Sequence, residues 1–563
     1  MADPTISGNN LSSLIGNSMV SFQHLDLSET RLEGLTPETF WNMTSLSHLI
    51  LYKNGLVPFL KVFATWQAYD TLILVETFLL VPKCLGNMTL LEHLDLCDND
   101  FVGSIPEAFG NLVTFTYLNL STNYLNDSIP KFLGNMTLFK FIDLHDNSFN
   151  GSIPKDFGNM ATLTYLDLGM NYFKGSNLIT FENLEGPILE AFGNMSALEQ
   201  LDLKNNKLAD NLLEGVISKA HFSELLKLNV LDFCLNKLIF NVSYAWVPRF
   251  RLDTICLNSS KLGPKFPRWL QTQDVYSWLD ISNTRVSDSI PSWFWDHRNL
   301  IDSVNLSNNQ LSGMIGNHSY FSTNAIDLSS NQLEGAVPMT TAFVVEGMRK
   351  LGSFDVGGNK LSGAIPAWIG ETLQDLVILN LRSNHLYGNF PSSLCHLLHL
   401  QLLDLFVNNI SGSIPKCLNN FFEMRYSYSA ITSTTIEHFY YTFNLREGSV
   451  GATYVDQIEV MWKGVVSEYG KTLGLVKGID LSTNMLNGEI PPEITERVGL
   501  IYFKLSRNNL SGKIPAEIGN LKSLDFLDLS NNQFSGQIPP TLRLIDRLSV
   551  LNLSNNNFQG KFQ

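Results

Sequence analysis

The sequence has little positive charge, no long apolar run and no cluster of residues suited to catalysis. Its 563 residues carry 38 Lys and Arg against 53 Asp and Glu, a formal net charge of −15. This balance argues against a nucleic-acid partner, which requires a basic surface. No run of about 18 apolar residues is present, so we expect no membrane-spanning segment. No Ser/His/Asp or paired-carboxylate arrangement stands out, so we expect neither an enzyme, nor a cofactor, nor a bound metal.

The sequence does contain a phrase that returns about every 24 residues, the period of a leucine-rich repeat. A clear copy runs from Leu94-Asp95-Leu96 through Asn99 to the segment 101–106, Phe-Val-Gly-Ser-Ile-Pro. The first apolar residue of the phrase recurs at Leu94, Leu118, Ile142, Leu166, Ile479, Phe503, Leu527 and Leu551, with looser copies at Leu25, Leu49, Leu201, Leu231, Ile255, Leu279, Val304, Ile326, Phe354, Leu379 and Leu403. Because such units cannot bury their apolar faces alone, the sequence predicts a stacked solenoid, whose usual function is binding.

Each phrase predicts a short strand followed by a turn. Side chains alternate along a strand, so Leu94 and Leu96 should point into the core while Asp95 points to the concave face. Leu120 and Leu144 should be buried in the same way as Leu96. An Asn recurs five residues after the first apolar residue, at Asn99, Asn123, Asn147, Asn171, Asn206, Asn236, Asn309, Asn331, Asn359, Asn384, Asn408, Asn484, Asn508, Asn532 and Asn556. An amide both donates and accepts, so a stacked Asn can satisfy the backbone groups of the turn.

The second half of the phrase resembles the plant-specific class of leucine-rich repeat, as in Ser152-Ile153-Pro154. Gly permits positive φ there, and Pro lies where no ladder donor is needed. The predicted fold is a leucine-rich-repeat solenoid of mostly β structure with short 3-10 segments. We expect a right-handed superhelical arc with a parallel concave sheet of roughly 20 strands. About 16 repeats should fill 1–417, with irregular stretches at 52–81 and 175–198, and four more should fill 476–563.

An island at 418–475 interrupts the repeats and is rich in aromatic residues. Its alternating stretch 457–462 predicts a strand, and Lys463-Gly464 allows a hairpin. Long insertions in a regular scaffold are usually functional or disordered, and the aromatic content argues against disorder. A small self-packed plug remains the alternative to a ligand-binding element.

Asparagine, cysteine and aspartate each add an expectation. Candidate glycosylation sites of the form Asn-x-Ser/Thr, which suit a secreted protein, lie at Asn42, Asn87, Asn126, Asn135, Asn150, Asn194, Asn241, Asn317 and Asn409. The sequons at Asn119, Asn305 and Asn552 arise from the repeat itself.

Cys395 and Cys417 occupy similar places in adjacent repeats and form the favoured disulfide candidate, with Cys234–Cys256 and then Cys84–Cys97 as weaker ones. A recurring Asp follows the first apolar residue, and it either forms hydrogen bonds as a repeat position or attracts a basic ligand.

The two ends lack several expected features. Residues 1–4 open a polar stretch without the charged-then-apolar pattern of a signal peptide, and no cysteine pair precedes the first repeat. Residues 560–563 end where Ile-Pro is due. Solenoids need polar caps at both ends. We therefore expect the chain to be an internal piece of a longer protein or a truncated gene product.

The island followed by four regular repeats is similar to plant leucine-rich-repeat receptor-like proteins. The segments 263–273, 290–295 and 462–476 resemble the branch that includes receptors for a fungal ethylene-inducing xylanase and apple-scab resistance proteins. The resemblance implies the ectodomain of a cell-surface immune receptor without its own kinase. It would bind a microbial or wall-derived protein or peptide elicitor and signal through leucine-rich-repeat coreceptor and adaptor receptor kinases at the plasma membrane. A receptor-kinase ectodomain and a secreted inhibitor of a wall-degrading enzyme are the alternatives.

Three groups of residues are the candidate binding sites. The outward position on four successive rungs carries His93, Tyr117, Phe141 and Tyr165, which should form an aromatic ladder for ligand, unless the rings only stack on one another. The island offers Tyr440, Tyr441, Trp462 and Lys463 to the ligand. The last four repeats carry Tyr502, Lys504 and Phe526, whose composition is typical of an interface hot spot and which we assign to the coreceptor.

Overall fold

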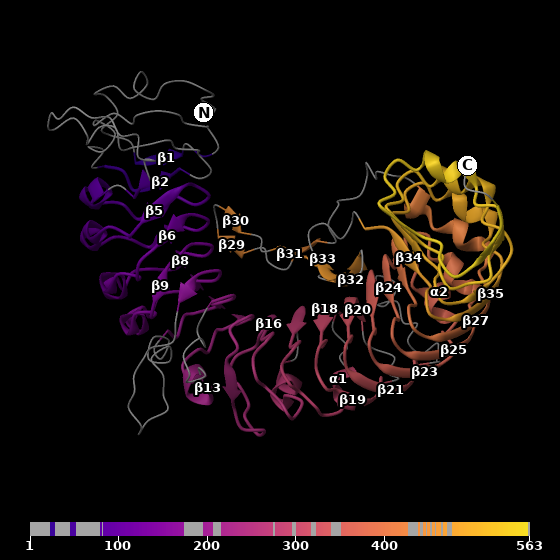
Figure 1. Ribbon diagram of the computed structural model, residues 1–563. Helices are drawn as coiled ribbons and strands as arrows, with labels where there is room; N and C mark the ends of the chain where they lie inside the picture. Colours follow the sequence, from indigo (N-terminus) through magenta and orange to yellow (C-terminus); the bar gives the residue numbers. More distant parts are fainter. Residues whose placement is uncertain are drawn as a thin grey trace, which may run out of the picture. The chain divides into compact units, whose positions relative to one another are not determined.

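The computed structural model describes residues 23–26, 28, 45–51, 79–81, 83–173, 195–206, 216–273, 276–295, 300–316, 322–338, 351–425, 437–439, 443–445, 448–450, 453–455, 458–462, 465–469 and 476–560. The chain divides into two compact units. Unit 1 comprises Met1–Leu262 with Pro267–Gln273, and unit 2 comprises Gly263–Phe266 with Asp274–Gln563. Both are built from stacked repeats (Figure 1).

Every repeat begins with a strand of the first sheet, and these strands pair in parallel. In unit 1 the strands are β1 (His24–Asp26), β2 (His48–Ile50), β4 (His93–Asp95), β6 (Tyr117–Asn119), β8 (Phe141–Asp143), β10 (Tyr165–Asp167), β12 (Gln200–Asp202), β14 (Val230–Asp232) and β16 (Thr254–Cys256). The register pairs Leu94 with Leu118 and Leu118 with Ile142. Each first apolar residue of the phrase therefore lies beside its copy in the next repeat, as the period predicts.

The first sheet of unit 2 follows the same rule. Its strands are β17 (Trp278–Asp280), β18 (Leu300–Asn305), β20 (Ser322–Asp327), β22 (Ser353–Asp355), β24 (Ile378–Asn380), β26 (Leu402–Asp404), β34 (Gly478–Asp480), β36 (Tyr502–Lys504), β38 (Phe526–Asp528) and β40 (Val550–Asn552). Strand β26 pairs directly with β34. The sheet is therefore continuous although residues 405–477 separate these two strands in the sequence.

The rest of each repeat forms a second short strand and then, in most repeats, a 3-10 helix. The second strands of unit 1 are β3 (Leu79–Leu80), β5 (Phe101–Gly103), β7 (Tyr124–Leu125), β9 (Asn150–Gly151), β11 (Tyr172–Phe173), β13 (Val216–Ser218) and β15 (Ile239–Asn241). Those of unit 2 are β19 (Ser312–Met314), β21 (Gln332–Ala336), β23 (Lys360–Gly363), β25 (His385–Asn389), β27 (Asn409–Ser413), β35 (Met485–Gly488), β37 (Asn509–Leu510), β39 (Ser535–Gly536) and β41 (Asn557–Phe558).

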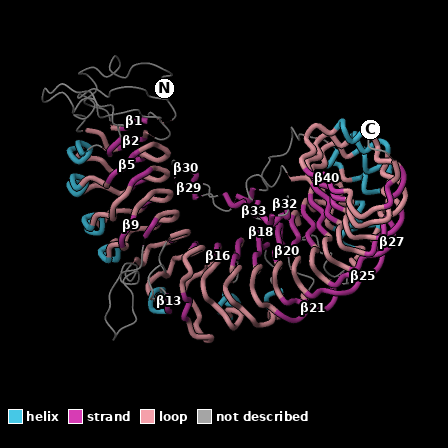
Figure 2. Tube along the Cα trace, viewed as in Figure 1, coloured by secondary structure: helices cyan, strands magenta, loops and turns pink. Residues whose placement is uncertain are grey.

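The helical turns lie away from the first sheet, as the cyan segments of Figure 2 show for the repeats of unit 1. They are η4 (Lys83–Asn87), η5 (Glu107–Asn111), η6 (Lys131–Asn135), η7 (Lys155–Asn159), η8 (Lys219–Phe222) and η9 (Arg268–Thr272) in unit 1, and α1 (Ser292–Trp295), α2 (Trp368–Thr372), η12 (Ser392–His396), η13 (Lys416–Asn420), η14 (Phe422–Arg425), η16 (Pro492–Glu496), η17 (Ala516–Asn520) and η18 (Pro540–Leu544) in unit 2. The Ile-Pro segment determines where each 3-10 helix begins. Before η5, for example, Pro106 is extended at φ −64°, and its carbonyl accepts a hydrogen bond from the amide of Phe109. Gly103 before it has φ +82°, a conformation that favours glycine.

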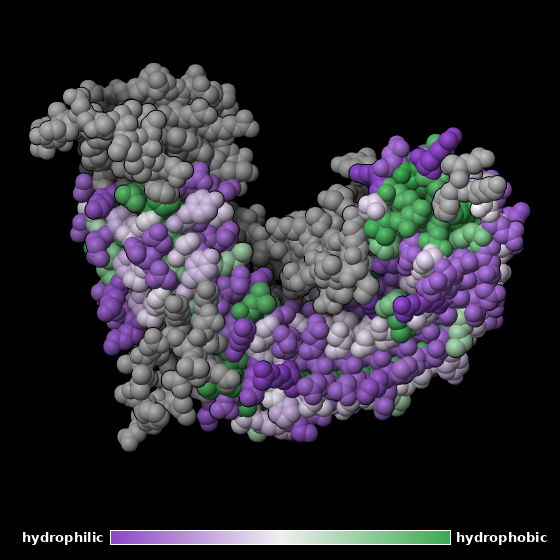
Figure 3. All heavy atoms as spheres, viewed as in Figure 1, coloured by the Kyte–Doolittle hydropathy of each residue, from purple (hydrophilic) through white to green (hydrophobic). Residues whose placement is uncertain are grey.

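The core of each unit is a continuous stack of inward side chains. Leu96, Leu120 and Leu144 are at most 1 % exposed, which confirms the predicted inward face. Fully burying a leucine contributes about 1.5–3 kcal/mol, and the stack repeats that contribution on every rung. Leu551, on the last described rung, is 45 % exposed. Figure 3 shows a hydrophobic patch over the repeats at the C-terminal end of unit 2.

The recurring asparagines form the predicted ladder inside the turns. The Asn123 side-chain amide donates to the carbonyls of Leu96 (3.0 Å), Leu120 (3.1 Å) and Ser121 (3.0 Å), while its Oδ1 accepts the amide of Phe101 at 3.0 Å. The residue before each ladder asparagine adopts the left-handed conformation, for example Thr122 at φ 53°. That tight turn leaves the backbone groups unpaired, and the asparagine satisfies them.

The island forms antiparallel pairs of its own. Strand β28 (Glu437–Phe439) pairs with β31 (Thr453–Val455), and β29 (Phe443–Leu445) pairs with β30 (Gly448–Val450). Strand β32 (Ile458–Trp462) pairs with β33 (Val465–Tyr469), with Trp462 opposite Val465, so the predicted hairpin is confirmed. The asparagine ladder continues past the island, because Asn484 donates to the Leu405 carbonyl at 2.9 Å.

Candidate ligand-binding surface

The strand face of the first sheet carries a row of aromatic side chains in unit 1. We use "strand face" for the side of the sheet that bears the residues on either side of each first apolar residue. The row comprises His24, His48, His93, Tyr117, Phe141 and Tyr165. The last four rings stack nearly in parallel, with centroid separations of 3.8, 4.2 and 4.1 Å in chain order. The structure therefore brings the four predicted ladder residues together.

The aromatic row is longer and more self-packed than the sequence interpretation stated. His24 and His48 extend it, with centroid separations of 5.2 Å between them and 5.4 Å from His48 to His93. His24 and His48 directly precede Leu25 and Leu49, the first apolar residues of two looser repeats. This shared repeat position is the sequence signal that could have placed both histidines in the row. Phe141 is only 3 % exposed, so ring stacking accounts for much of its burial. Burial and then the charges of His48 and His24 lower the pKa of His93 to about 4, so His93 is neutral at pH 7.

The recurring aspartates on the strand face act as turn-forming hydrogen-bond acceptors. Asp95 Oδ1 accepts the amide of Cys97 at 3.0 Å, and Asp355 Oδ1 accepts that of Gly357 at 2.9 Å. The same bond to the residue two positions on is made by Asp26, Asp143, Asp167, Asp202, Asp232, Asp280, Asp327, Asp404, Asp480 and Asp528. These bonds support the interpretation that the recurring aspartate stabilises the turn of each repeat, rather than the alternative that the aspartates attract a basic ligand.

One aspartate pair on the strand face encloses a histidine. His145 Nδ1 lies 2.7 Å from Asp143 Oδ1 and 3.8 Å from Asp167 Oδ2. Burial alone would lower the pKa of His145, but the hydrogen bond and charge of Asp143, together with the charge of Asp167, raise it to about 9. Burial and the neighbouring Asp143 raise the pKa of Asp167 to about 7, against the opposing effect of His145.

Two groups in the described part of the chain have the residue types of a metal site. They are Asp143 with His145 and Asp167, and Asp232 with Cys234 and Cys256. In the first group the histidine is already hydrogen-bonded to a carboxylate. In the second the two sulfurs are bonded to each other. Neither arrangement supplies a free set of ligands.

The His145 cluster predicts a stability that falls in alkali. The folded pKa of His145 lies above the ordinary 6.5, so its contribution is complete below pH 6.5 and is lost as pH rises through about 9. The raised pKa of Asp167 acts lower, between about 4 and 7. Thermal unfolding at pH of about 7.5 and about 9 should therefore show a loss in the wild type that His145→Gln abolishes.

The control for this pH dependence is His221→Gln. Burial lowers the pKa of His221 to about 4, so His221 is neutral throughout the tested range. This variant should keep the wild-type difference between the two pH values. A wild-type pH difference that survives in His145→Gln would contradict the assignment.

The favoured cysteine pair and the first of the weaker candidates are both disulfide-bonded. Cys395 bonds Cys417 with a Cα separation of 5.5 Å, and Cys234 bonds Cys256 with 5.4 Å. Cys97 is a free cysteine, and the Cys84 side chain lies outside the described residues. The bonds link adjacent rungs, as the sequence spacing of the two pairs suggested.

The candidate patch in the last repeats packs inward. Lys504 Nζ lies 5.1 Å from the Tyr502 ring centroid and 5.3 Å from that of Phe526, and 3.4 Å from Asp480 Oδ2. The predicted aromatic–cation–aromatic arrangement is therefore present. Tyr502 is only 1 % exposed, however, because its ring lies over Gly478, and Lys504 is also buried. Phe526, which is half-buried, provides the accessible part.

The described glycosylation candidates avoid the strand face. Asn87, Asn126, Asn135, Asn150, Asn241 and Asn409 are all exposed and lie on 3-10 helices or on or beside second strands. Asn119, whose sequon arises from the repeat, lies on the strand face and is buried. Asn42, Asn194 and Asn317 lie outside the described residues, as do Tyr440, Tyr441, Lys463 and the side chain of Trp462. Glycans at the six exposed positions would leave the strand face open.

Comparison with known proteins agrees with this architecture. A family model described as Leucine Rich Repeat matches residues 21–43, 90–112, 114–136, 139–160, 375–397, 399–421, 499–521 and 523–544. The chain thus contains leucine-rich repeats and has the fold that such repeats form. It is 34 % identical over 378 residues to Receptor-like protein EIX2 of Solanum lycopersicum, an alignment that covers 51 % of this chain and 36 % of that relative. The chain thus spans about a third of the length of that curated relative.

Solved plant receptors share the fold of this chain. The ectodomain of the Arabidopsis receptor kinase HAESA, solved with an N-terminally extended IDA peptide hormone, is 27 % identical with a TM-score of 0.59. The plant peptide hormone receptor RGFR1, solved with RGF2, is 25 % identical with a TM-score of 0.64. Both comparisons cover 96 % of this chain, and 71 % and 83 % of the respective receptors. No helix within the described residues has the length and apolarity to cross a membrane.

Proposed function

We propose that this chain is the ligand-binding ectodomain part of a plant cell-surface immune receptor-like protein. It would recognise a microbial or wall-derived protein or peptide elicitor outside the cell, and partner receptor kinases would carry the signal. The similarity to EIX2 supports the receptor class, and the peptide-bound plant receptors support a ligand-binding use of the fold. The chemistry of a receptor ectodomain requires binding and no catalysis.

The observation that carries the proposal is an aromatic row on the strand face of unit 1, where the sequon residue Asn119 is buried. The row runs across six rungs, from His24 to Tyr165, and the lowered pKa of His93 keeps its middle uncharged at pH 7. Stacked rings are rigid and lose little entropy on binding, so they suit a contact surface. Glycans on the opposite elements would leave the strand face as the larger glycan-free surface for a protein partner.

A double substitution in the row tests the ligand surface. Tyr117→Ser with Phe141→Ser should weaken binding at least about tenfold, because hot-spot aromatic residues contribute 2 kcal/mol or more. The first probe is a fungal ethylene-inducing xylanase, the ligand class implied by the resemblance, and the measurement is surface plasmon resonance. His93→Gln, a milder change, should weaken the same complex without loss of fold.

The matched control uses tyrosines on the second strands of the Tyr117 and Tyr165 repeats, both of which belong to the aromatic row. Tyr124 and Tyr172 are 61 % and 49 % exposed, so Tyr124→Ser with Tyr172→Ser removes exposed aromatic area away from the strand face. This control should bind as the wild type does. Equal loss in the control, or unchanged affinity in the row variants with intact thermal stability, would reject the surface.

We propose that the last four repeats bind the coreceptor through Phe526. The partner would be the ectodomain of a small leucine-rich-repeat receptor kinase. Because Tyr502 and Lys504 are buried, they position Phe526 rather than reach a partner. Phe526→Ala should reduce elicitor-dependent capture of that ectodomain about tenfold in a pull-down.

Met485→Ala provides the coreceptor control. Met485 is 53 % exposed on the second strand β35, in the same part of unit 2. Its loss should leave capture unchanged. If Phe526→Ala retains full capture while Met485→Ala abolishes it, the coreceptor binds another face of these repeats.

A further inference from the structure

A surface pocket of about 230 Å³ lies in unit 1, away from the strand face. It forms between η8 and the segment 246–249 that follows β15. In the neighbouring repeat, β13 is followed by the 3-10 helix η8, whereas after β15 a loop takes that place and the Trp246 amide donates to the Ser243 carbonyl at 2.9 Å. The missing helical turn leaves the pocket open.

The floor of the pocket is aromatic and apolar. Phe222, Trp246, Val247 and Pro248 contribute to the lining. The Trp246 ring is half-buried, and its centroid lies 5.6 Å from that of Phe222 and 5.7 Å from that of Trp269. Because this cluster holds the indole from behind, the pocket is preformed. Its volume is below the usual 300–1,000 Å³ of a small-molecule site and suits a single side chain.

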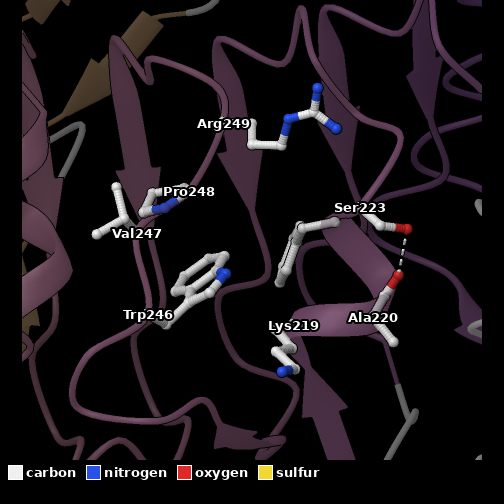
Figure 4. A pocket seen from close by; sticks show the side chains of 8 residues that line it. Lys219, Ala220, Ser223, Trp246, Val247, Pro248 and Arg249 are labelled. Atoms are coloured by element: carbon white, nitrogen blue, oxygen red, sulfur yellow. Dashed lines mark hydrogen bonds between the residues drawn. The ribbon is translucent and has the colours of Figure 1, made fainter.

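Two cations border this floor. Figure 4 shows Arg249 and Lys219 at opposite ends of the pocket, on either side of Trp246. Neither side chain forms an ion pair with another described residue. The surrounding stretches 216–262 and 267–273 hold seven Lys and Arg against three Asp and Glu, in a chain whose net charge is −15. This local excess of positive charge favours an anionic ligand.

The lining also indicates the kind of anion. It contains no Asp, Glu, Asn or Gln side chain, and the Ser223 hydroxyl already donates to the Ala220 carbonyl at 2.9 Å. The hydroxyl groups of a sugar would therefore find few acceptors. An apolar side chain between two carboxylates would match both the aromatic floor and the two cations.

We propose that this pocket binds an acidic peptide segment, with one apolar side chain on Trp246 and flanking carboxylates paired with Lys219 and Arg249. The site is separate from the aromatic row, so it does not depend on the proposed elicitor surface. It would give the protein a second contact with a polypeptide partner, on a flank of the repeats.

The test uses the full chain and two peptides blocked at both ends, Gly-Asp-Leu-Asp-Gly and Gly-Asn-Leu-Asn-Gly. In ligand-observed NMR titrations at about 50 mM salt, where charge interactions are weakly screened, the Asp peptide should bind at least about fivefold more tightly. Arg249→Gln and Lys219→Gln should each weaken it about fivefold. Val247→Glu, at a side chain that is 60 % exposed, places a like charge on the rim and should abolish binding without affecting the fold.

Lys261→Gln is the matched control, because Lys261 is an exposed cation of the same region that does not line the pocket. It should change the affinity less than twofold. Equal affinity for both peptides, or an equal loss in Lys261→Gln and Arg249→Gln, would overturn the proposal. So would tri-galacturonic acid binding with sensitivity to Val247→Glu while neither peptide binds, because the ligand would then be a saccharide.

Discussion

The Asn123→Ala variant is expected to lose about 3 kcal/mol of local stability in the repeats around β6. Asn123 is 6 % exposed, and its amide serves three carbonyls and one backbone amide within 3.1 Å. Alanine would remove one buried bond from each of these four groups, although the three carbonyls keep bonds from Asn99, Asn147 and the Asp98 amide. Four buried hydrogen bonds at about 0.5–1.5 kcal/mol each account for the expected loss.

Hydrogen exchange is the suitable measurement, because a long repeat array does not unfold in one step. Peptides from 93 to 125 should lose protection in Asn123→Ala, whereas those from 476 to 560 should not. Asn111→Ala is the control: Asn111 ends η5 and is exposed, so its loss should cost less than about 0.5 kcal/mol. Equal protection in both variants would mean that the ladder bonds contribute little.

A second large effect is expected from Gly478→Ala. Gly478 pairs with Tyr502 in the next strand, and the Tyr502 ring occupies the space that a Cβ on Gly478 would need. Overpacking of this kind lowers the free energy of unfolding by about 1–3 kcal/mol. Because Gly478→Ala would displace a buried ring, we expect a loss near the upper value, about 3 kcal/mol. Gly352→Ala is the control, since its Cβ would meet nothing closer than 3.7 Å.

A double-mutant cycle isolates the cause. In a Tyr502→Ala background the ring is absent, so Gly478→Ala should cost less than about 0.5 kcal/mol, a coupling of more than about 2.5 kcal/mol. Hydrogen exchange of peptides from 476 to 528 in the four proteins measures it. Additive costs would show that Gly478 is required for backbone conformation instead. The elicitor-dependent capture assay applied to Gly478→Ala would also show whether a displaced Tyr502 disturbs the coreceptor surface at Phe526.

The repeats were predictable because each carries the same local signals. The Leu-x-Leu alternation, the ladder asparagine and the Gly-x-Ile-Pro segment each determine a piece of backbone within about a dozen residues. The register of the first sheet, with Leu94 beside Leu118, then follows from the period alone. The aromatic ladder was predictable for the same reason, since equal positions in equal repeats stack.

The remaining features depend on differences between repeats, which periodicity does not report. Tyr502 is buried because Gly478, one rung earlier, has no side chain. The pKa of His145 depends on Asp167, one rung later. The pocket at Trp246 exists because one repeat forms a loop where its neighbour forms a helix. In each case the contacting residue lies about one period away. The feature depends on which residue type stands at that position, and the repeat consensus does not specify it.

The asparagine ladder also has a direction. Asn123 and Asn147 both bond backward, to groups of the preceding repeat. Translation proceeds from the N-terminus. Each newly synthesised repeat would thus supply the asparagine that satisfies the turn of the repeat before it. Among the described ladder bonds the longest separation is at Leu405, whose carbonyl receives Asn484 from 79 residues later, after the island has been synthesised. During translation the turn at Leu405 would therefore stay incomplete longer than any other described turn of the ladder, including that of Leu51, which waits 48 residues for Asn99.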